Sequence, residues 1–230
     1  MVAGLLGLLA FAAWKGAPVL SYCLCGLAIY VIVGSFVDLG RRVFAGGASN
    51  AWTRGAGLPR SAYGTAFAHA GVGISLLGLA ASGWGQEHIL TMKPGDSAQI
   101  GPYTAVVQSL APVNGPNYTA AVARTAIMQG GTTIATIEPA ARFYPVRKMN
   151  RAEAGIATIG VGQLYMSISN PAGGNSVDVR LYWKPLVTLI WIGALIMGFG
   201  GALSLSDRRL RFGIASRARR SAGPAPQAAE

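Results

Sequence analysis

Three segments of this chain are long and apolar enough to cross a lipid bilayer, and they constrain its fold more than any other feature. They cover residues 19–37, 63–84 and 185–205. An α-helix rises about 1.5 Å per residue, so about 20 apolar residues span the roughly 30 Å hydrocarbon core. The sequence therefore predicts a helical membrane protein. Residues 1–13 are apolar but shorter, and we expect them to add a partial or marginal helix to an N-terminal membrane region of residues 1–40.

The basic residues gather at the ends of these segments. Residues 41–62 contain Arg41, Arg42, Arg54 and Arg60 and no acid, and residues 206–230 begin with Ser206-Asp-Arg-Arg. Because such charges favour the cytoplasmic side, we expect a basic loop and a basic tail there. The net charge of +11 is thus explained by topology, and no nucleic-acid partner is predicted.

Residues 85–184 are then expected on the outer side, and their pattern is that of a β domain. Short β-prone runs alternate with turns such as Asn114-Gly-Pro-Asn. The predicted strands are 103–110, 120–128, 132–137, 157–160, 164–169 and 177–181. A hundred residues can bury one modest core, so we predict a small sandwich or barrel. The overall fold class is α+β, with transmembrane helices and an inserted small all-β domain.

His69 lies within the second apolar segment, where water cannot solvate an imidazole. A histidine in that place requires a partner, so it is the first candidate for function. Thr65, Ala66 and Gly73 lie on the same helical face and leave room for a flat cofactor or for a second helix. His69 is therefore a candidate haem or metal ligand. A hydrogen bond to a neighbouring helix and a proton relay in a transporter remain alternatives.

The other candidates have weaker support. Cys23 and Cys25 point to nearly opposite sides of a helix, which favours two small apolar residues over a redox pair. His88 is expected in a solvated interfacial loop. Arg147, Lys148 and Arg151 fit a solvated basic loop, or a site for an acidic partner or haem propionates.

Aromatic residues cluster with turn residues at Asn114–Tyr118 and Arg142–Pro145, where the aromatics are expected in the core of the β domain. No residue of the chain is assigned a catalytic role, because no nucleophile elbow, phosphate-binding loop or convincing catalytic triad is present in the sequence.

An ordered set of motifs carries a family resemblance over most of residues 1–212. The set comprises Tyr63-Gly-x-x-x-Ala-His-Ala-Gly-Val, Met92-Lys-Pro-Gly-Asp-Ser, Gly115-Pro-Asn-Tyr, Arg142-Phe-Tyr, Val179-Arg-Leu-Tyr-Trp-Lys-Pro and Gly198-x-Gly-Gly. With these motifs the chain resembles the C-terminal part of the CcmF family, the haem lyase subunit of bacterial cytochrome c maturation system I. The nitrite-reductase haem lyases are similar but fit less well.

The resemblance implies a site and a cofactor. In this family the intramembrane histidine at the position of His69 is one axial ligand of a haem b, and the opposing ligand lies earlier in the full protein. The haem that is handled transiently as substrate binds a periplasmic region that is also earlier. We therefore expect a split or truncated protein that is catalytically incomplete alone.

The resemblance also implies partners and a location. The expected partners are the remaining N-terminal portion of CcmF, CcmH-type and CcmE-type maturation subunits, apocytochrome c and membrane lipid. The expected location is the bacterial inner membrane, with the β domain in the periplasm and the C-terminus in the cytoplasm, in preference to the mitochondrial inner membrane. A membrane-anchored partner-binding domain without haem is the alternative function.

Overall fold

The computed structural model describes residues 18–169 and 175–207, which fall into two compact units. The β unit contains the described residues up to Cys23 and Gly78–Leu189, and the helical unit contains Leu24–Leu77 and the described residues from Ile190. Helix α2 (Val19–Phe44) runs through the boundary at Cys23. The short apolar start and most of the basic tail, both discussed above, lie outside the described residues.

The helical unit is built on three helices, which are α2, α4 (Arg60–Ala80) and α5 (Leu189–Leu205). The segment expected as a loop is largely helical instead, with the end of α2, η1 (Ala48–Asn50) and α3 (Ala51–Gly57). Arg41 and Arg42 extend α2 because cations are favourable in the last turn of a helix. Arg42 also pairs with Asp38 one turn earlier, at 2.9 Å.

Two of the three predicted spans are long enough for a bilayer. Among the described helices, α2 and α4 extended through η2 (Ala81–Trp84) are long and apolar enough to cross a membrane. Their mean hydropathies are 2.1 and 1.4. Helix α5 has 17 residues, because residues 185–188 form a turn in which Leu186 has a φ of 58°. At about 1.5 Å per residue it covers roughly 25 Å.

Glycines bring α4 and α5 into direct backbone contact. A Cβ atom on Gly71 would lie 2.6 Å from the carbonyl oxygen of Gly193, and one on Gly64 would lie 2.5 Å from that of Gly200. The two pairs are seven residues apart on both helices, so the contact recurs every two turns. Small residues of this kind allow membrane helices to approach closely.

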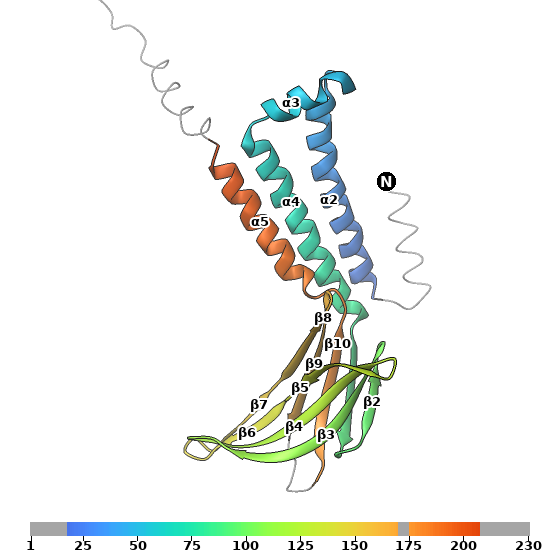
Figure 1. Cartoon of the computed structure of the whole chain (residues 1–230). Coiled ribbons are helices and arrows are strands. Elements are labelled where there is room, and N and C mark those ends of the chain that lie inside the picture. Colours follow the sequence, from blue (N-terminus) through green and yellow to red (C-terminus); the bar gives the residue numbers. More distant parts are fainter. Residues whose placement is uncertain (1–17, 170–174, 208–230) are drawn as a thin grey trace, which may run out of the picture. The chain divides into compact units, whose positions relative to one another are not determined.

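A third glycine brings α4 against α2. A Cβ atom on Gly73 would lie 2.5 Å from the side chain of Ile32 and 2.9 Å from the carbonyl oxygen of Ala28. Helix α4 therefore contacts α5 through one face and α2 through another, and it stands between them in Figure 1. A third face of α4 is directed away from both of these contacts and contains exposed residues.

The β unit is a sandwich of two antiparallel sheets, which confirms the small all-β domain predicted from the sequence. The first sheet has the order β1 (Gln86–Met92), β10 (Val177–Lys184), β9 (Gly162–Ser169), β8 (Gly155–Ile159). The second has the order β2 (Ser97–Ile100), β3 (Tyr103–Asn114), β4 (Thr119–Gln129), β6 (Ala140–Tyr144), β7 (Met149–Glu153), and β5 (Thr132–Ile137) also pairs with β4.

Alternating apolar residues of the two sheets form the core of the β unit. In β9, for example, Leu164, Met166 and Ile168 are buried, whereas the residues between them are half-buried. Trp183 closes one end of the core, with its ring 4.7 Å from that of Tyr103. Side chains at Gly101 and Gly162 would collide with this indole.

Four strands were not predicted from the sequence, namely β1, β2, β6 and β7. They carry many exposed polar residues and so lack a clear apolar alternation. Two expectations are corrected as a result. His88 lies in β1 opposite Leu181 and not in a loop, and Arg151 lies in β7 and not in the basic turn.

The aromatic residues beside the turns are also placed differently from the prediction. Tyr118 and Tyr144 are half-buried and Phe143 is 41% exposed, so they do not belong to the core. They lie beside the turns at one end of the second sheet. Residue type alone could not distinguish these aromatics from those of the core, because the difference lies in their position in the fold.

Candidate functional site on helix α4

The third face of α4 carries His69. Thr65, His69 and Val72 recur at helical spacing and are all exposed, whereas the glycine-rich faces of the same helix are buried. An exposed imidazole on an apolar helix is costly in a bilayer unless a ligand or another helix meets it. The imidazole of His69 is therefore accessible to a ligand or to another helix.

The backbone of α4 fixes one ring nitrogen of His69. Its Nδ1 atom lies 2.8 Å from the carbonyl oxygen of Thr65, one turn earlier. A carbonyl oxygen only accepts hydrogen bonds, so Nδ1 carries the hydrogen and Nε2 keeps a free lone pair. This is the arrangement in which a neutral imidazole binds a metal, because the hydrogen bond sets both the tautomer and the ring orientation.

A chain of hydrogen bonds links this turn to the beginning of the helix. The Thr65 hydroxyl donates to the carbonyl oxygen of Ser61 at 2.8 Å. Both the amide and the hydroxyl of Ser61 donate to the carboxylate of Asp207, at 3.1 and 2.8 Å. Asp207 follows α5 and is only 5% exposed. Its carboxylate thus satisfies a free amide at the N-terminus of α4 and favours the positive end of that helix.

The residues predicted around His69 separate into two groups. Thr65 accompanies His69 on the exposed face and accepts its hydrogen bond. Ala66 and Gly73 are buried, and Gly73 packs against α2. Of the two uses considered for Gly73, a cofactor face or a helix-packing face, the geometry matches helix packing.

The remaining candidates lie elsewhere. His88 is exposed in β1 of the β unit. Cys23 and Cys25 are free and half-buried on α2. Within residues 18–169 and 175–207 no three residues of the types His, Cys, Asp and Glu gather into a metal site.

Asp207 is the residue that sequence reasoning missed. It was read only as part of a basic exit from the last apolar segment. The signal was present, since one acid stands directly before a series of arginines at the end of a helix. Its partner Ser61 could not be foreseen, because 146 residues separate the two.

The β unit contains a perturbed tyrosine. A hydrogen bond to Glu87, together with burial, raises the pKa of Tyr182 above its ordinary value of 10.0. The two residues are directly opposite each other in β1 and β10. The rings of Tyr182 and Tyr165 meet edge to face with their centroids 5.6 Å apart. The arrangement is a surface cluster on the first sheet.

Comparison with known proteins gives one family. Residues 83–185 match the model of the CcmF C-terminal β-sandwich. The chain is 42% identical over 226 residues to the cytochrome c-type biogenesis protein CycK of Rhizobium meliloti, covering 95% of this chain and 33% of that protein. It is 35% identical over 173 residues to CcmF of Pseudomonas aeruginosa, covering 75% and 26%.

A solved structure agrees with these matches. The fold is similar to that of a cytochrome c haem lyase CcmF, with a TM-score of 0.64, 20% identity, and coverage of 89% of this chain and 34% of that one. The chain spans between a quarter and a third of the length of the curated relatives described above.

Proposed function

Because the chain belongs to the CcmF family, as the C-terminal portion of such a protein, we propose that His69 is an axial ligand of a haem b within the membrane. The general role is cytochrome c biogenesis as part of a haem lyase assembly. The observation that carries the proposal is the hydrogen bond from Nδ1 of His69 to the carbonyl oxygen of Thr65 at 2.8 Å. It leaves Nε2 as an outward lone pair on an exposed apolar helix face.

The neighbouring residues fit a flat macrocycle. Thr65 and Val72 flank His69 on the exposed face, and neither is a long or charged side chain. The close packing of α4 on α5 and α2 holds the helix that carries the imidazole. When bound, haem would supply one-electron redox chemistry. The chain itself would orient the iron ligand and set its tautomer.

A second histidine that helped to hold the haem would have to come from outside this chain's helical unit. The chain has two histidines, and His88 lies in a strand of the β unit. We therefore propose that the opposing histidine comes from another polypeptide segment of the assembly.

The charges support an orientation. Arg41, Arg42, Arg54 and Arg60 lie where α2 ends and α4 begins. By the preference of basic loops for the cytoplasm, this end faces the cytoplasm and the β unit faces the periplasm of the bacterial inner membrane. Tyr22 and Trp84, whose ring centroids are 5.8 Å apart, fit an aromatic belt at the periplasmic interface.

The whole assembly, rather than this chain, would join haem to apocytochrome c. In that reaction each vinyl group of haem takes up one cysteine thiol across its double bond, which forms a thioether. The β unit would serve as a docking module for CcmH-type or CcmE-type subunits. A docking module without any haem is the second candidate function, and the separate, complete core of the β unit favours it.

A haem spectrum distinguishes the two functions. The chain is co-expressed with the N-terminal two thirds of a relative such as the R. meliloti protein and purified from membranes. We expect a reduced-minus-oxidised spectrum with a b-type band. The band should be lost in His69→Ala and kept in His88→Ala, which removes the other histidine of the chain.

A rescue experiment separates ligation from folding. In His69→Gly, added imidazole should restore the band, because a free imidazole can take the place of the side chain. A b-type band that persists in His69→Ala, or the absence of any band in the unmutated complex, would contradict haem ligation by His69. The second of these results would favour the docking module.

A further inference from the structure

A cationic surface lies at the end of the β unit that is far from its links to α4 and α5. We call it the basic hairpin, and it consists of β6, β7 and the turn between them, residues 140–153. The opposite end of the sandwich is marked by Gln86 and Trp183, where the chain leaves toward α4 and α5. Strand β3 runs from Tyr103 beside Trp183 to the far end over 12 residues, or roughly 40 Å at about 3.3 Å each.

Two arginines bring like charges together in the basic hairpin. Arg142 in β6 and Arg151 in β7 are directly opposite each other, and like charges in such pairs repel. Glu153 pairs with Arg142, and Tyr118 stacks on the same guanidinium at 4.2 Å. The Nε atom of Arg142 is nevertheless buried without a hydrogen-bond partner among the described residues. An anion brought to this surface would relieve the repulsion.

Three cations of the basic hairpin, two in its turn and one in β7, are also free to meet an anion. Arg147, Lys148 and Arg151 are exposed, and no acidic group of the described chain lies within 4.0 Å of them. Val146 at the tip is 91% exposed. A partner for this tip therefore combines negative charge with some apolar surface.

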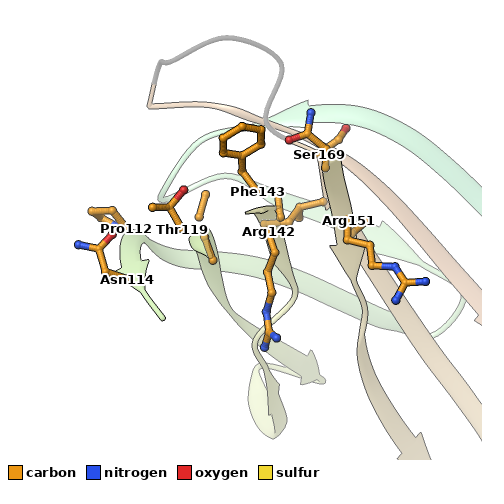
Figure 2. Close-up of a pocket in the computed structure, with 13 residues that line it drawn as sticks. Pro112, Asn114, Thr119, Arg142, Phe143, Arg151 and Ser169 are labelled. Atoms are coloured by element: carbon orange, nitrogen blue, oxygen red, sulfur yellow. The ribbon is translucent and has the colours of Figure 1, made fainter. Parts of the chain in front are cut away.

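A groove beside the hairpin supplies the apolar contact. It has a volume of about 420 Å³ and is lined by residues of both sheets. Its lining includes Ala121, Ala141, Ala152 and Ile168, with Asn114, Thr119 and Ser169 at the edge. Figure 2 shows Phe143 on one side of β6, and Arg142 extending to the other side.

From these features we infer that the basic hairpin docks an extended acidic segment of a partner protein. Its carboxylates meet Arg147, Lys148 and Arg151, and one of its apolar side chains enters the groove. Among the described strands, β7 pairs only with β6, so its other edge can accept backbone hydrogen bonds from an extended segment. Arginine and tyrosine are among the residues that most often dominate binding at protein interfaces.

A protein partner fits better than a lipid surface. The hairpin lies at the end of the β unit opposite Gln86 and Lys184, from which the chain continues into the helices. The unpaired edge of β7 and the apolar groove beside it suit an extended peptide with a backbone and alternating side chains, which a lipid headgroup does not provide. The inference refines the docking role proposed above and is independent of haem ligation by His69.

The test uses the full chain in a neutral detergent and a fluorescein-labelled ten-residue peptide of alternating glutamate and valine. Fluorescence anisotropy measures its affinity. The triple variant Arg147→Gln/Lys148→Gln/Arg151→Gln should bind about tenfold more weakly, because interfacial charge pairs are lost. The matched variant Lys93→Gln/Arg124→Gln/Arg180→Gln removes the same charge from exposed cations elsewhere in the β unit and should bind as the parent does.

Three results would overturn the inference. One is an equal loss in both triple variants, which indicates diffuse attraction by net charge. Another is equal binding of a peptide with glutamine in place of glutamate. The third is tighter binding of phosphatidylglycerol vesicles than of the peptide through the same three cations, which indicates a membrane surface. His69→Ala should leave peptide binding unchanged, so a failure here is distinct from a failure of the haem proposal.

Discussion

A single carboxylate joins the end of α5 to the beginning of α4. Asp207 accepts two hydrogen bonds from Ser61 and is almost completely buried. We expect Asp207→Ala to destabilise the helical unit by about 1–2 kcal/mol, because the Ser61 amide and hydroxyl lose their acceptor. Thermal unfolding of the purified protein, followed by helical circular dichroism, measures the change.

The control for this prediction is another aspartate of the helical unit. Asp38 forms an exposed ion pair with Arg42, and such pairs contribute about 0–1 kcal/mol. Asp38→Ala should therefore cost clearly less than Asp207→Ala. Equal losses in the two variants would show that the buried carboxylate has no special role.

Tyr182 gives a prediction about pH. Its raised pKa means that the folded protein keeps the phenol proton at pH values where the unfolded chain has lost it. The folded state therefore loses relative stability as the pH rises above 10.0 toward the raised pKa. We expect Glu87→Ala to lower the pKa of Tyr182, because the hydrogen bond to Glu87 is the main cause of the shift.

Phenolate absorbance measures this pKa when the titration of Tyr182→Phe is subtracted from that of the parent. If the subtracted curve has the same midpoint with and without Glu87, the hydrogen bond does not hold the proton. The lone histidine of an apolar segment was visible in the sequence, whereas the pair of Glu87 and Tyr182 and the Nδ1 partner of His69 were not. Both depend on side-chain orientation and on strand register.

At the scale of elements, the contact between α4 and α5 depends on glycine. Gly193 faces backbone atoms of α4, whereas a Cβ atom on Gly198 of the same helix would meet no neighbouring atom of the described chain within 4 Å. We expect Gly193→Leu to destabilise the helix pair by about 1–3 kcal/mol, since the helices must separate to admit the side chain. Gly198→Leu should cause no loss, and leucine is also the better helix former.

Detergent-dependent unfolding of the two variants checks this prediction, with helical circular dichroism as the signal. A similar stability of both proteins would mean that α4 and α5 do not meet through Gly193.

The sequence predicted the helices well because long apolar runs are a strong signal. It missed the hairpin of β6 and β7 because Arg142, Asn150 and Arg151 mask the apolar alternation of these two strands.

At the scale of the molecule, the described chain contains two separate packed regions. The buried cluster of the β unit is drawn from strands between Met92 and Leu181. We expect Leu164→Ala to destabilise the β unit by about 2–5 kcal/mol, because the side chain is fully buried. The loss of sheet signal on heating should shift to lower temperature, while the helical signal should keep its midpoint.

Gly193→Leu should give the reverse pattern, with an earlier loss of helix and an unchanged sheet transition. A common shift of both signals in either variant would show that the two regions unfold as one. The long apolar runs and the short β-prone runs between turn residues predicted an apolar helical part and a β-rich part. The pairing order of the strands remained open, because β1 and β10 are neighbours in the sheet although about 90 residues separate them.

The glycine contacts of α4 have a consequence for how the protein tolerates change. The atoms that face Gly64 and Gly71 belong mainly to the backbone of α5. A larger residue at either position therefore cannot be accommodated by a smaller side chain on α5. Such a residue would push α4 away from α5 and shift His69 with it. The position of His69 relative to α5 is therefore set by two backbone contacts that lie two helical turns apart.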